Sequence, residues 1–147
     1  MKLSTQADYA VRAVFELSRH EAGAVVHTGD IAVAQRIPSA RLAKVVQDLA
    51  RAGLVRTMRG QQGGVMLARP AADITVRDVY EAVEGPILLC RCRQRVEQCG
   101  DDGCDTHQFW SGLESLLTQQ LQTVTFAALV DRRCPAGTDG RPSTSRR

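Results

Sequence analysis

The sequence predicts a mainly α-helical fold with one β-hairpin and a long helix near the C-terminus. Apolar residues recur at the i, i+3, i+4, i+7 spacing of amphipathic helices, and a Gly-rich turn separates two short β-like runs. Aromatic residues make up only 4% of the 147 residues although 44% are hydrophobic, so the core must be built from Leu, Val, Ile and Ala. Such a core suits helices better than a β-sandwich.

Three helices are predicted in the first third of the chain, over residues 4–19, 28–35 and 39–53. Ser4 and Ser39 are expected to be the N-caps of the first and third helices, and Gly53 is of the type that commonly follows a helix. Pro38 disfavours helical geometry in the residue before it, so the chain turns tightly between the second and third helices. The third helix has a polar face opposite an apolar stripe formed by Leu42, Val45, Val46 and Leu49.

A hairpin is predicted over residues 54–68 and a further helix over 75–84, which Thr75 and Asp78 cap and the Gly-Pro pair at 85–86 ends. Two short helices that meet at a tight turn, with a polar face on the second, form a helix-turn-helix. A hairpin directly after them corresponds to a wing. The predicted fold class is therefore a mainly α winged helix-turn-helix with a long C-terminal dimerisation helix.

That long helix is expected from about Thr106 to Val130, with an apolar stripe formed by Trp110, Leu113, Leu117, Leu121, Val124 and Ala128. A lone amphipathic helix of this length usually needs a partner, so we expect a homodimer. The predicted organisation is a winged helix-turn-helix domain over 1–85, a cysteine-rich loop over 86–105, a dimerisation helix over 106–133 and a disordered tail, rich in Pro, Gly, Ser and Arg, over 134–147.

Basic residues gather in the first half of the chain although its formal net charge is only +3. A local basic face on a nearly neutral chain fits contact with DNA phosphates, and a merely solvated surface is the alternative. Glycines in the wing let the backbone approach phosphate, and arginines can enter a narrow minor groove. The candidate DNA-binding residues are Ser39, Arg41, Lys44, Gln47, Arg56, Arg59 and Gly60.

Four of the five cysteines lie within fifteen residues, at Cys90, Cys92, Cys99 and Cys104, and His107 follows them. No apolar stretch approaches the roughly 20 residues of a membrane span, and no apolar leader precedes the first helix, so we expect a cytoplasmic protein whose thiols stay reduced. A cysteine cluster then indicates a metal or redox centre. The irregular spacing favours an iron–sulfur cluster; zinc held by three cysteines and His107, and uncomplexed redox thiols, remain alternatives.

Catalysis is not indicated by any Ser/His/Asp set, paired carboxylates or phosphate loop, so the chain is not expected to be an enzyme or to have a small-molecule substrate. A thiol oxidoreductase is disfavoured because no CxxC lies near a strand–helix unit. The remaining alternative to a DNA-binding protein is a zinc- or cluster-stabilised interaction module whose winged helix binds a partner protein.

Three segments, LSTQADYAVRAVFELS, LAKVVQDLARAGLVRTMRGQQGGVMLARPAADITVRDVYEAVE and VTFAALV, resemble the group of winged helix-turn-helix iron–sulfur regulators that includes IscR, NsrR and RirA. The resemblance covers residues 1–130 and implies a homodimer that binds double-stranded operator DNA. It also implies that three loop cysteines bind the cluster, and Cys92, Cys99 and Cys104 match them best. Their spacing departs from the family pattern, and the additional Cys90 could replace Cys92.

The resemblance leaves the fourth ligand open among Asp8, His107 and Cys90. His107 resembles the histidine that completes a two-iron (2Fe–2S) cluster in IscR, whereas Asp8 resembles the aspartate that binds a four-iron (4Fe–4S) cluster in NsrR. A carboxylate in the first turn also simply stabilises a helix. The DNA-binding half is closer to NsrR, because Ala43 stands where IscR has an acidic residue. The expected function is a regulator, in particular a repressor, whose operator affinity depends on a cluster that senses nitric oxide, iron or redox state.

Overall fold

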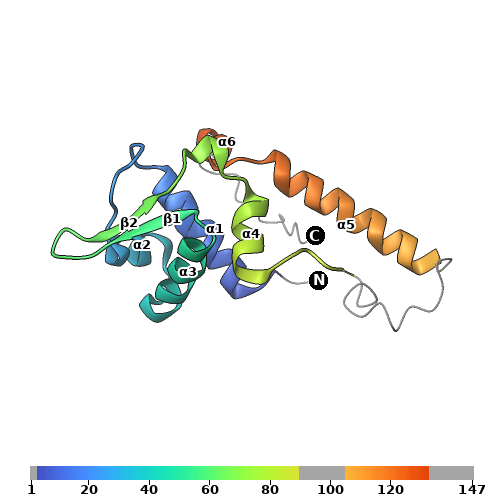
Figure 1. Cartoon of the computed structure of the whole chain (residues 1–147), viewed down its shortest axis with the longest axis horizontal. Helices are drawn as coiled ribbons and strands as arrows, with labels where there is room; N and C mark the ends of the chain where they lie inside the picture. Colours follow the sequence, from blue (N-terminus) through green and yellow to red (C-terminus); the bar gives the residue numbers. More distant parts are fainter. Residues whose placement is uncertain (1–2, 90–104, 133–147) are drawn as a thin grey trace, which may run out of the picture.

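The computed structural model describes residues 3–89 and 105–132 and has the predicted mainly helical fold with one antiparallel hairpin. Figure 1 shows a body of helices, a hairpin that projects from one end and a helix that extends from the other. In chain order the elements are α1 (Thr5–Ser18), α2 (Thr28–Gln35), α3 (Ser39–Arg51), β1 (Val55–Met58), β2 (Gly64–Leu67), the 3₁₀ turn η1 (Ala71–Asp73), α4 (Val76–Glu84), α5 (Asp105–Thr123) and α6 (Phe126–Asp131). The cysteine loop over 90–104 and the tail lie outside the described residues.

The first three helices begin and end close to the predicted positions. The Ser4 hydroxyl caps α1 by accepting a hydrogen bond from the backbone of Ala7, and Gly53 follows α3 with a φ of 71°. The prediction that Ser39 caps α3 is wrong. Pro38 is the N-cap, and its carbonyl accepts hydrogen bonds from the backbone of Arg41 and Leu42 at 2.9 and 3.0 Å, so Ser39 is the first helical residue and makes no capping bond.

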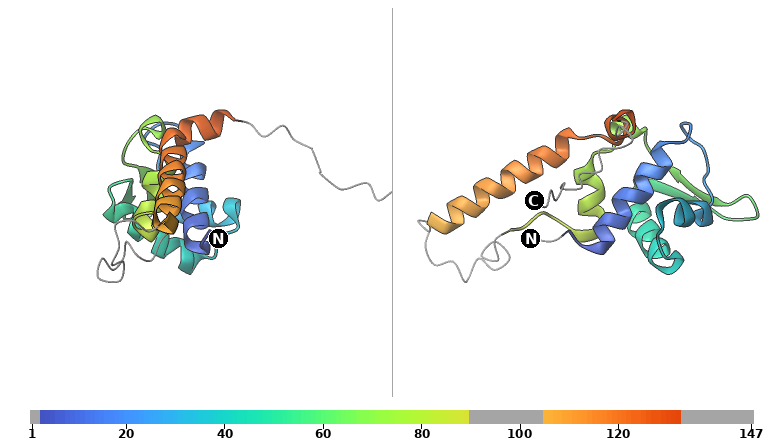
Figure 2. Two further views of the ribbon diagram at one scale, coloured as in Figure 1. Left: turned by 90° about the vertical axis from the view of Figure 1, so that its right-hand side faces the viewer. Right: turned by 180° about the vertical axis from the view of Figure 1, so that it is seen from behind.

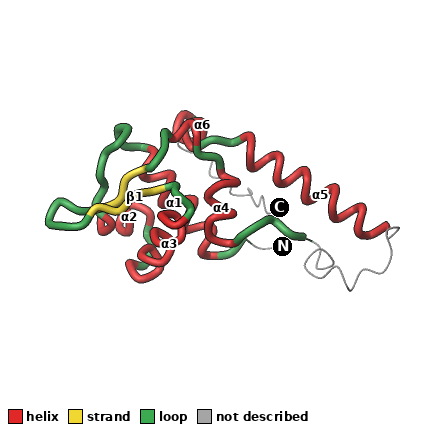
Figure 3. Tube along the Cα trace, viewed as in Figure 1, coloured by secondary structure: helices red, strands yellow, loops and turns green. Residues whose placement is uncertain are grey.

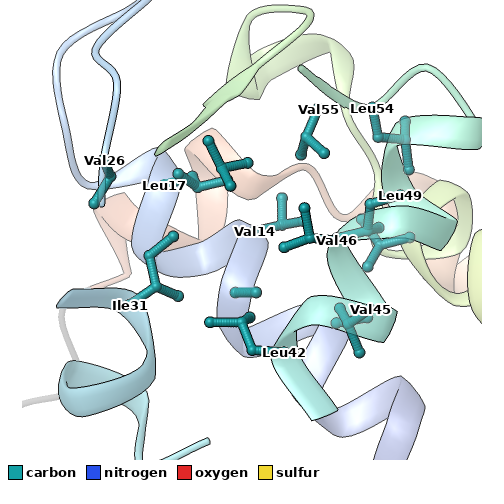
Figure 4. Close-up of a cluster of buried hydrophobic side chains, with 14 of the residues drawn as sticks. Val14, Leu17, Val26, Ile31, Leu42, Val45, Val46, Leu49, Leu54 and Val55 are labelled. Carbon is teal, nitrogen blue, oxygen red and sulfur yellow. The ribbon is translucent and has the colours of Figure 1, made fainter. Parts of the chain in front are cut away.

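The core of the body forms where the apolar stripes of α1 and α3 meet (Figure 4). Val14 and Leu17 of α1 lie among the α3 stripe, with Ile31 of α2 and Val55 of β1 completing the cluster. Burying one such side chain contributes about 1.5–3 kcal/mol to folding. This packing fixes which face of α3 is buried and leaves its polar face in solvent.

The hairpin is a two-stranded antiparallel sheet in which Val55 pairs with Leu67 and Met58 with Gly64. A further bridge joins Val26 to Val65 through two backbone hydrogen bonds of 2.8 Å. The strands have four residues each, and the tip of the projecting hairpin is a loop (Figure 3). The bridge therefore attaches β2, close to the turn of the wing, to the loop before α2.

The prediction of one continuous helix from about 106 to 130 is wrong, because the chain breaks between α5 and α6. The backbone of Val76 donates to the Val124 carbonyl at 2.9 Å, and Phe126 donates to the Ile74 carbonyl at 3.0 Å. The Thr125 hydroxyl then caps α6, and the Phe126 side chain is fully buried in the body. The chain returns from α5 to complete the core, and this tertiary pairing outweighs helical continuity.

Helix α5 packs against α4 but extends well beyond the body, as the right-hand view in Figure 2 shows. Of its predicted stripe, Leu113, Leu117 and Leu121 are partly buried, whereas Trp110 is 42% exposed. Phe109 and Leu116 are 64% and 65% exposed. Within residues 3–89 and 105–132, no helix is both long and apolar enough to cross a membrane.

Candidate nucleic-acid interface and metal centre

The polar face of α3 is presented to solvent as the sequence predicts. Ser39, Arg41, Lys44 and Gln47 are all exposed on it, because the opposite side of the helix is fixed in the core. The ammonium group of Lys44 lies 2.9 Å from the carboxylate of Asp48 on the same helix. A helix-turn-helix that presents such a face is suited to entering the major groove.

The wing carries the other candidate contacts, and all of them are exposed. Arg56 lies on β1, and Arg59 and Gly60 begin the turn. No salt bridge joins Arg41, Arg56 or Arg59 to another part of the described chain. Guanidinium groups without an internal partner are free to meet phosphates or the minor groove.

The wing glycines have different structural roles. Gly60 has a φ of 113°, which favours glycine, and a Cβ there would meet no neighbouring atom. A Cβ on Gly63 would lie 2.5 Å from the Met58 carbonyl oxygen, and one on Gly64 would lie 2.3 Å from that of Val26. Gly63 and Gly64 are therefore required by the protein's own backbone, and Gly60 alone of these three leaves space for a ligand.

The metal-ligand candidates are only partly covered by the structure. Cys90, Cys92, Cys99 and Cys104 lie outside the described residues. Within the described ranges, no three His, Cys, Asp or Glu side chains form a metal-binding group. The segment before the loop is fastened to α5, because the backbone of Leu89 donates to the buried Glu114 carboxylate at 3.2 Å.

His107 lies in the first turn of α5, three residues after the last loop cysteine. Its Nδ1 is buried and has no hydrogen-bond partner among the described residues, while its Nε2 lies 3.4 Å from the Ser111 hydroxyl. A buried polar nitrogen without a partner costs about 1–3 kcal/mol, so an unoccupied Nδ1 needs an explanation. Binding of a metal ion at that lone pair would supply one.

Asp8 lies in the first turn of α1, and its carboxylate is 3.0 Å from the guanidinium of Arg12. The start of α5, which carries His107, projects away from the body that contains α1 (Figure 2). Within one protomer the structure therefore does not bring these two candidate ligands together.

Three buried carboxylates, Glu16, Asp48 and Glu114, were missed by the sequence analysis. Glu16 accepts from the Gln35 amide at 2.6 Å and so joins α1 to α2, and Asp48 joins α3 to α1. Asp48 lies four residues after Lys44 and three residues before Arg51, and these are the spacings of ion pairs on a helix. That spacing was the available signal for Asp48.

Two helices joined by a tight turn, an exposed polar face on the second and a basic hairpin after it define the class of winged helix-turn-helix DNA-binding proteins. The Rrf2 family, described as iron-dependent transcriptional regulators, matches residues 3–132 of the chain. The chain therefore belongs to the Rrf2 family.

Individual relatives agree with this assignment. An HTH-type transcriptional regulator of Mycobacterium tuberculosis is 42% identical over 91 residues, which are 62% of this chain and 56% of that protein, so the match spans little more than half of its length. The HTH-type transcriptional regulator IscR of Photorhabdus laumondii is 31% identical over 147 residues, which are 100% of this chain and 90% of that protein.

Solved structures show the same fold. The structure of IscR from T. potens has a TM-score of 0.74 and 30% identity, and the match covers 89% of this chain and 87% of that one. CymR of B. subtilis, named as a global cysteine regulator, has a TM-score of 0.76 and 26% identity over 90% of this chain and 98% of that one. These relatives are regulators, so the predictions of a transcriptional regulator and of a chain that is not an enzyme are confirmed.

Proposed function

We propose that this regulator binds double-stranded operator DNA through α3 and the wing and acts as a repressor in the cytoplasm. The observation that carries the proposal is that all seven candidate DNA contacts are exposed on those two elements while the rest of α3 and the hairpin root are held by the core. Arg59 and Gly60 at the wing would meet the minor groove or a phosphate. The major groove would face four residues of α3: Ser39, Arg41, Lys44 and Gln47. Arg56 would contact the phosphate backbone of the DNA.

The proposed active form is a homodimer held together by α5. Exposed apolar side chains on one long helix, including Phe109, Trp110 and Leu116, are what a second copy would cover. Two copies of α3 would then occupy major grooves about one helical turn apart. Because α6 packs into the body, we propose that the dimerisation element ends with α5, and that the winged-helix unit over 1–85 includes α6 as well.

We further propose that the cysteine loop holds an iron–sulfur cluster. The residues present fit such a group: thiolates are soft ligands, and the buried Nδ1 of His107 has no hydrogen-bond partner within residues 3–89 and 105–132. Cys92, Cys99, Cys104 and His107 would hold it, with Cys90 as a substitute for Cys92. When bound, the cluster would supply a centre that nitric oxide, oxidants or shortage of iron can alter.

The side chains around His107 support this choice over Asp8. A hydrogen on Nε2 directed toward Ser111 leaves the Nδ1 lone pair for a metal, which is the usual way an outer partner orients a histidine ligand. Asp8 already has an internal partner, because its Oδ2 lies 3.0 Å from the guanidinium of Arg12. Helix α4 packs against α1, α3 and α5, so it connects the region beside the loop with the DNA-reading helices.

Anaerobic purification tests the cluster proposal. We expect brown protein with iron and sulfide in comparable amounts, and loss of colour in Cys99→Ala and Cys104→Ala. His107→Ala should change the visible spectrum, whereas His27→Ala, at an exposed histidine before α2, should not. Colourless protein with stoichiometric zinc and no sulfide would contradict the proposal, and a spectrum changed by Asp8→Ala alone would make Asp8 the ligand.

Salt titration tests the DNA proposal independently of the cluster. Binding through several phosphates should weaken steeply as salt rises. A partner-protein module would instead bind no duplex, and that result would contradict the proposal.

A further inference from the structure

The carboxylate of Asp48 is buried directly behind the DNA-reading face of α3. Asp48 is only 6% exposed. Its Oδ1 accepts hydrogen bonds from the ammonium of Lys44 at 2.9 Å and from the guanidinium of Arg51 at 3.2 Å. Its Oδ2 accepts a hydrogen bond from the side-chain amide of Gln6 on α1 at 2.9 Å. Because a buried charge is stable only when it is paired, these three donors hold the carboxylate, and the carboxylate in turn holds them.

The basic residues of α3 and the wing, which together form the proposed DNA-reading surface, therefore fall into two groups. Lys44 and Arg51 are tied to Asp48, whereas Arg41, Arg56 and Arg59 have no ion pair within the described residues. Gln6, Arg41 and Lys44 line a groove of about 300 Å³ between the start of α1 and α3. A tied cation, Lys44, and a free one, Arg41, thus lie on the same groove.

We propose that Asp48 is a specificity-determining residue, which restrains Lys44 and Arg51 and so limits the sequence-independent attraction of α3 to phosphate. The proposal rests on the proposed DNA-binding function. A free cation that meets a phosphate contributes about 0.9 to the slope of log affinity against log salt. A cation already shared with a carboxylate contributes less, because part of its charge is neutralised before DNA arrives.

Loss of the Asp48 carboxylate would have two physical effects on DNA affinity. Removing the carboxylate frees two cations and raises attraction to any phosphate. It also releases Lys44 from a defined position, which weakens contacts that depend on geometry. The first effect raises operator and non-operator affinity alike and steepens the salt dependence of binding. The second effect weakens contacts made only with the operator, so it lowers the ratio of operator to non-operator affinity.

The test compares two duplexes: one that the wild-type chain enriches from a random-sequence pool, and a scrambled duplex of the same composition. Asp48→Asn should lower the affinity ratio by roughly three- to tenfold, the range expected when one long side chain loses its order. It should also steepen the salt slope on the scrambled duplex by about one. An unchanged ratio and slope in folded Asp48→Asn protein would overturn the proposal.

Two controls separate this role from a structural one. Glu16→Gln removes a comparably buried carboxylate that accepts hydrogen bonds from Arg19 and from the Gln35 amide. Glu16 joins α1 to α2 and makes no contact with Lys44 or Arg51 among these bonds, so its loss reports only the cost of removing a buried carboxylate. Gln6→Ala keeps the carboxylate with both of its cations. Both variants should leave the ratio within about twofold of the wild type; a drop in Glu16→Gln as large as in Asp48→Asn would overturn the proposal.

If Asp48→Asn does not fold, Lys44→Gln in the native chain supplies the second test. A restrained lysine should change the salt slope by less than about half a unit, whereas the full change of about 0.9 expected of a free lysine would overturn the proposal. A wild-type chain that enriches no duplex would contradict the DNA-binding function itself. That outcome differs from one in which the wild type binds its operator selectively and Asp48→Asn keeps the same ratio of operator to non-operator affinity. The second outcome would contradict only the role of Asp48.

Discussion

The winged-helix body and α5 differ in how far their large apolar side chains are buried. In the body, helices from distant parts of the chain bury one another, and even Phe126 from α6 returns to fill the core. In α5, Phe109 and Leu116 remain more than half exposed, although the helix is the longest in the described structure. The body is complete within one chain, and α5 presents a surface that another chain would complete. Stability and assembly should therefore respond to different residues.

The largest effect is expected from the core of the body. Phe126→Ala should lower the free energy of unfolding by about 3–5 kcal/mol, because it removes a fully buried ring that joins α6 to the core. Urea denaturation followed by circular dichroism measures the change. Phe109→Ala on α5 is the matched control and should cost less than about 1 kcal/mol under conditions where the chain is monomeric. Equal losses in the two variants would contradict the division between body and α5.

The next effect concerns assembly. Leu116→Glu should raise the dissociation constant of the dimer at least about 30-fold, since a buried charge replaces an apolar contact of the kind that dominates interfaces. Sedimentation equilibrium measures it, while circular dichroism should show an intact body. Gln120→Glu, which adds the same charge at an exposed polar position of α5, should leave the dimer unchanged. A dimer that tolerates Leu116→Glu would exclude this side of α5 as the interface.

A third effect concerns the wing, which lies at the end of the molecule opposite α5 (Figure 1). Arg59→Ala should weaken operator binding by about 1–3 kcal/mol without changing the unfolding midpoint, because the side chain is exposed and has no ion pair in the described structure. Arg41→Ala, at a cation of α3 without an ion pair in the described structure, should show a smaller and less sequence-selective loss. Arg132→Ala removes the same charge beside α6 and is the control for net charge. Unchanged affinity in Arg59→Ala would show that the wing makes no contact.

The smallest effect on stability compares a helix capped by a side chain, α6, with a helix capped by backbone alone, α3. Thr125→Ala should cost about 1 kcal/mol of stability, because its hydroxyl accepts the backbone hydrogen bond that begins α6. Ser39→Ala should cost almost nothing, since Pro38 already occupies the N-cap position of α3. Thermal melts of the two variants measure the difference. A loss in Ser39→Ala as large as in Thr125→Ala would restore Ser39 as a cap.

Local interactions explain why much of the fold was predictable. Helix α4 is an example: Thr75 and Asp78 form reciprocal side-chain to backbone bonds three residues apart, and Gly85 ends the helix with a φ of 80°. The buried stripes of α1 and α3 and the position of the hairpin also followed from spacing and glycine alone. The exposed face of α3 was predictable for the same reason, because a helix that buries one stripe exposes the other.

The sequence by itself determined where α1, α2, α3 and α4 start, which of their faces are apolar and where the wing turns, since each depends on residues within a few positions of one another. Tertiary structure decided the rest. The end of α5 is set by backbone pairing with residues 74–76, about fifty residues earlier in the chain, and the requirement for Gly64 is set by the carbonyl of Val26. Only packing gave Asp48 its partner on α1 and buried the Nδ1 of His107 without a hydrogen-bond partner in the described part of the chain. Such contacts join groups that are distant in sequence, and no periodicity records them.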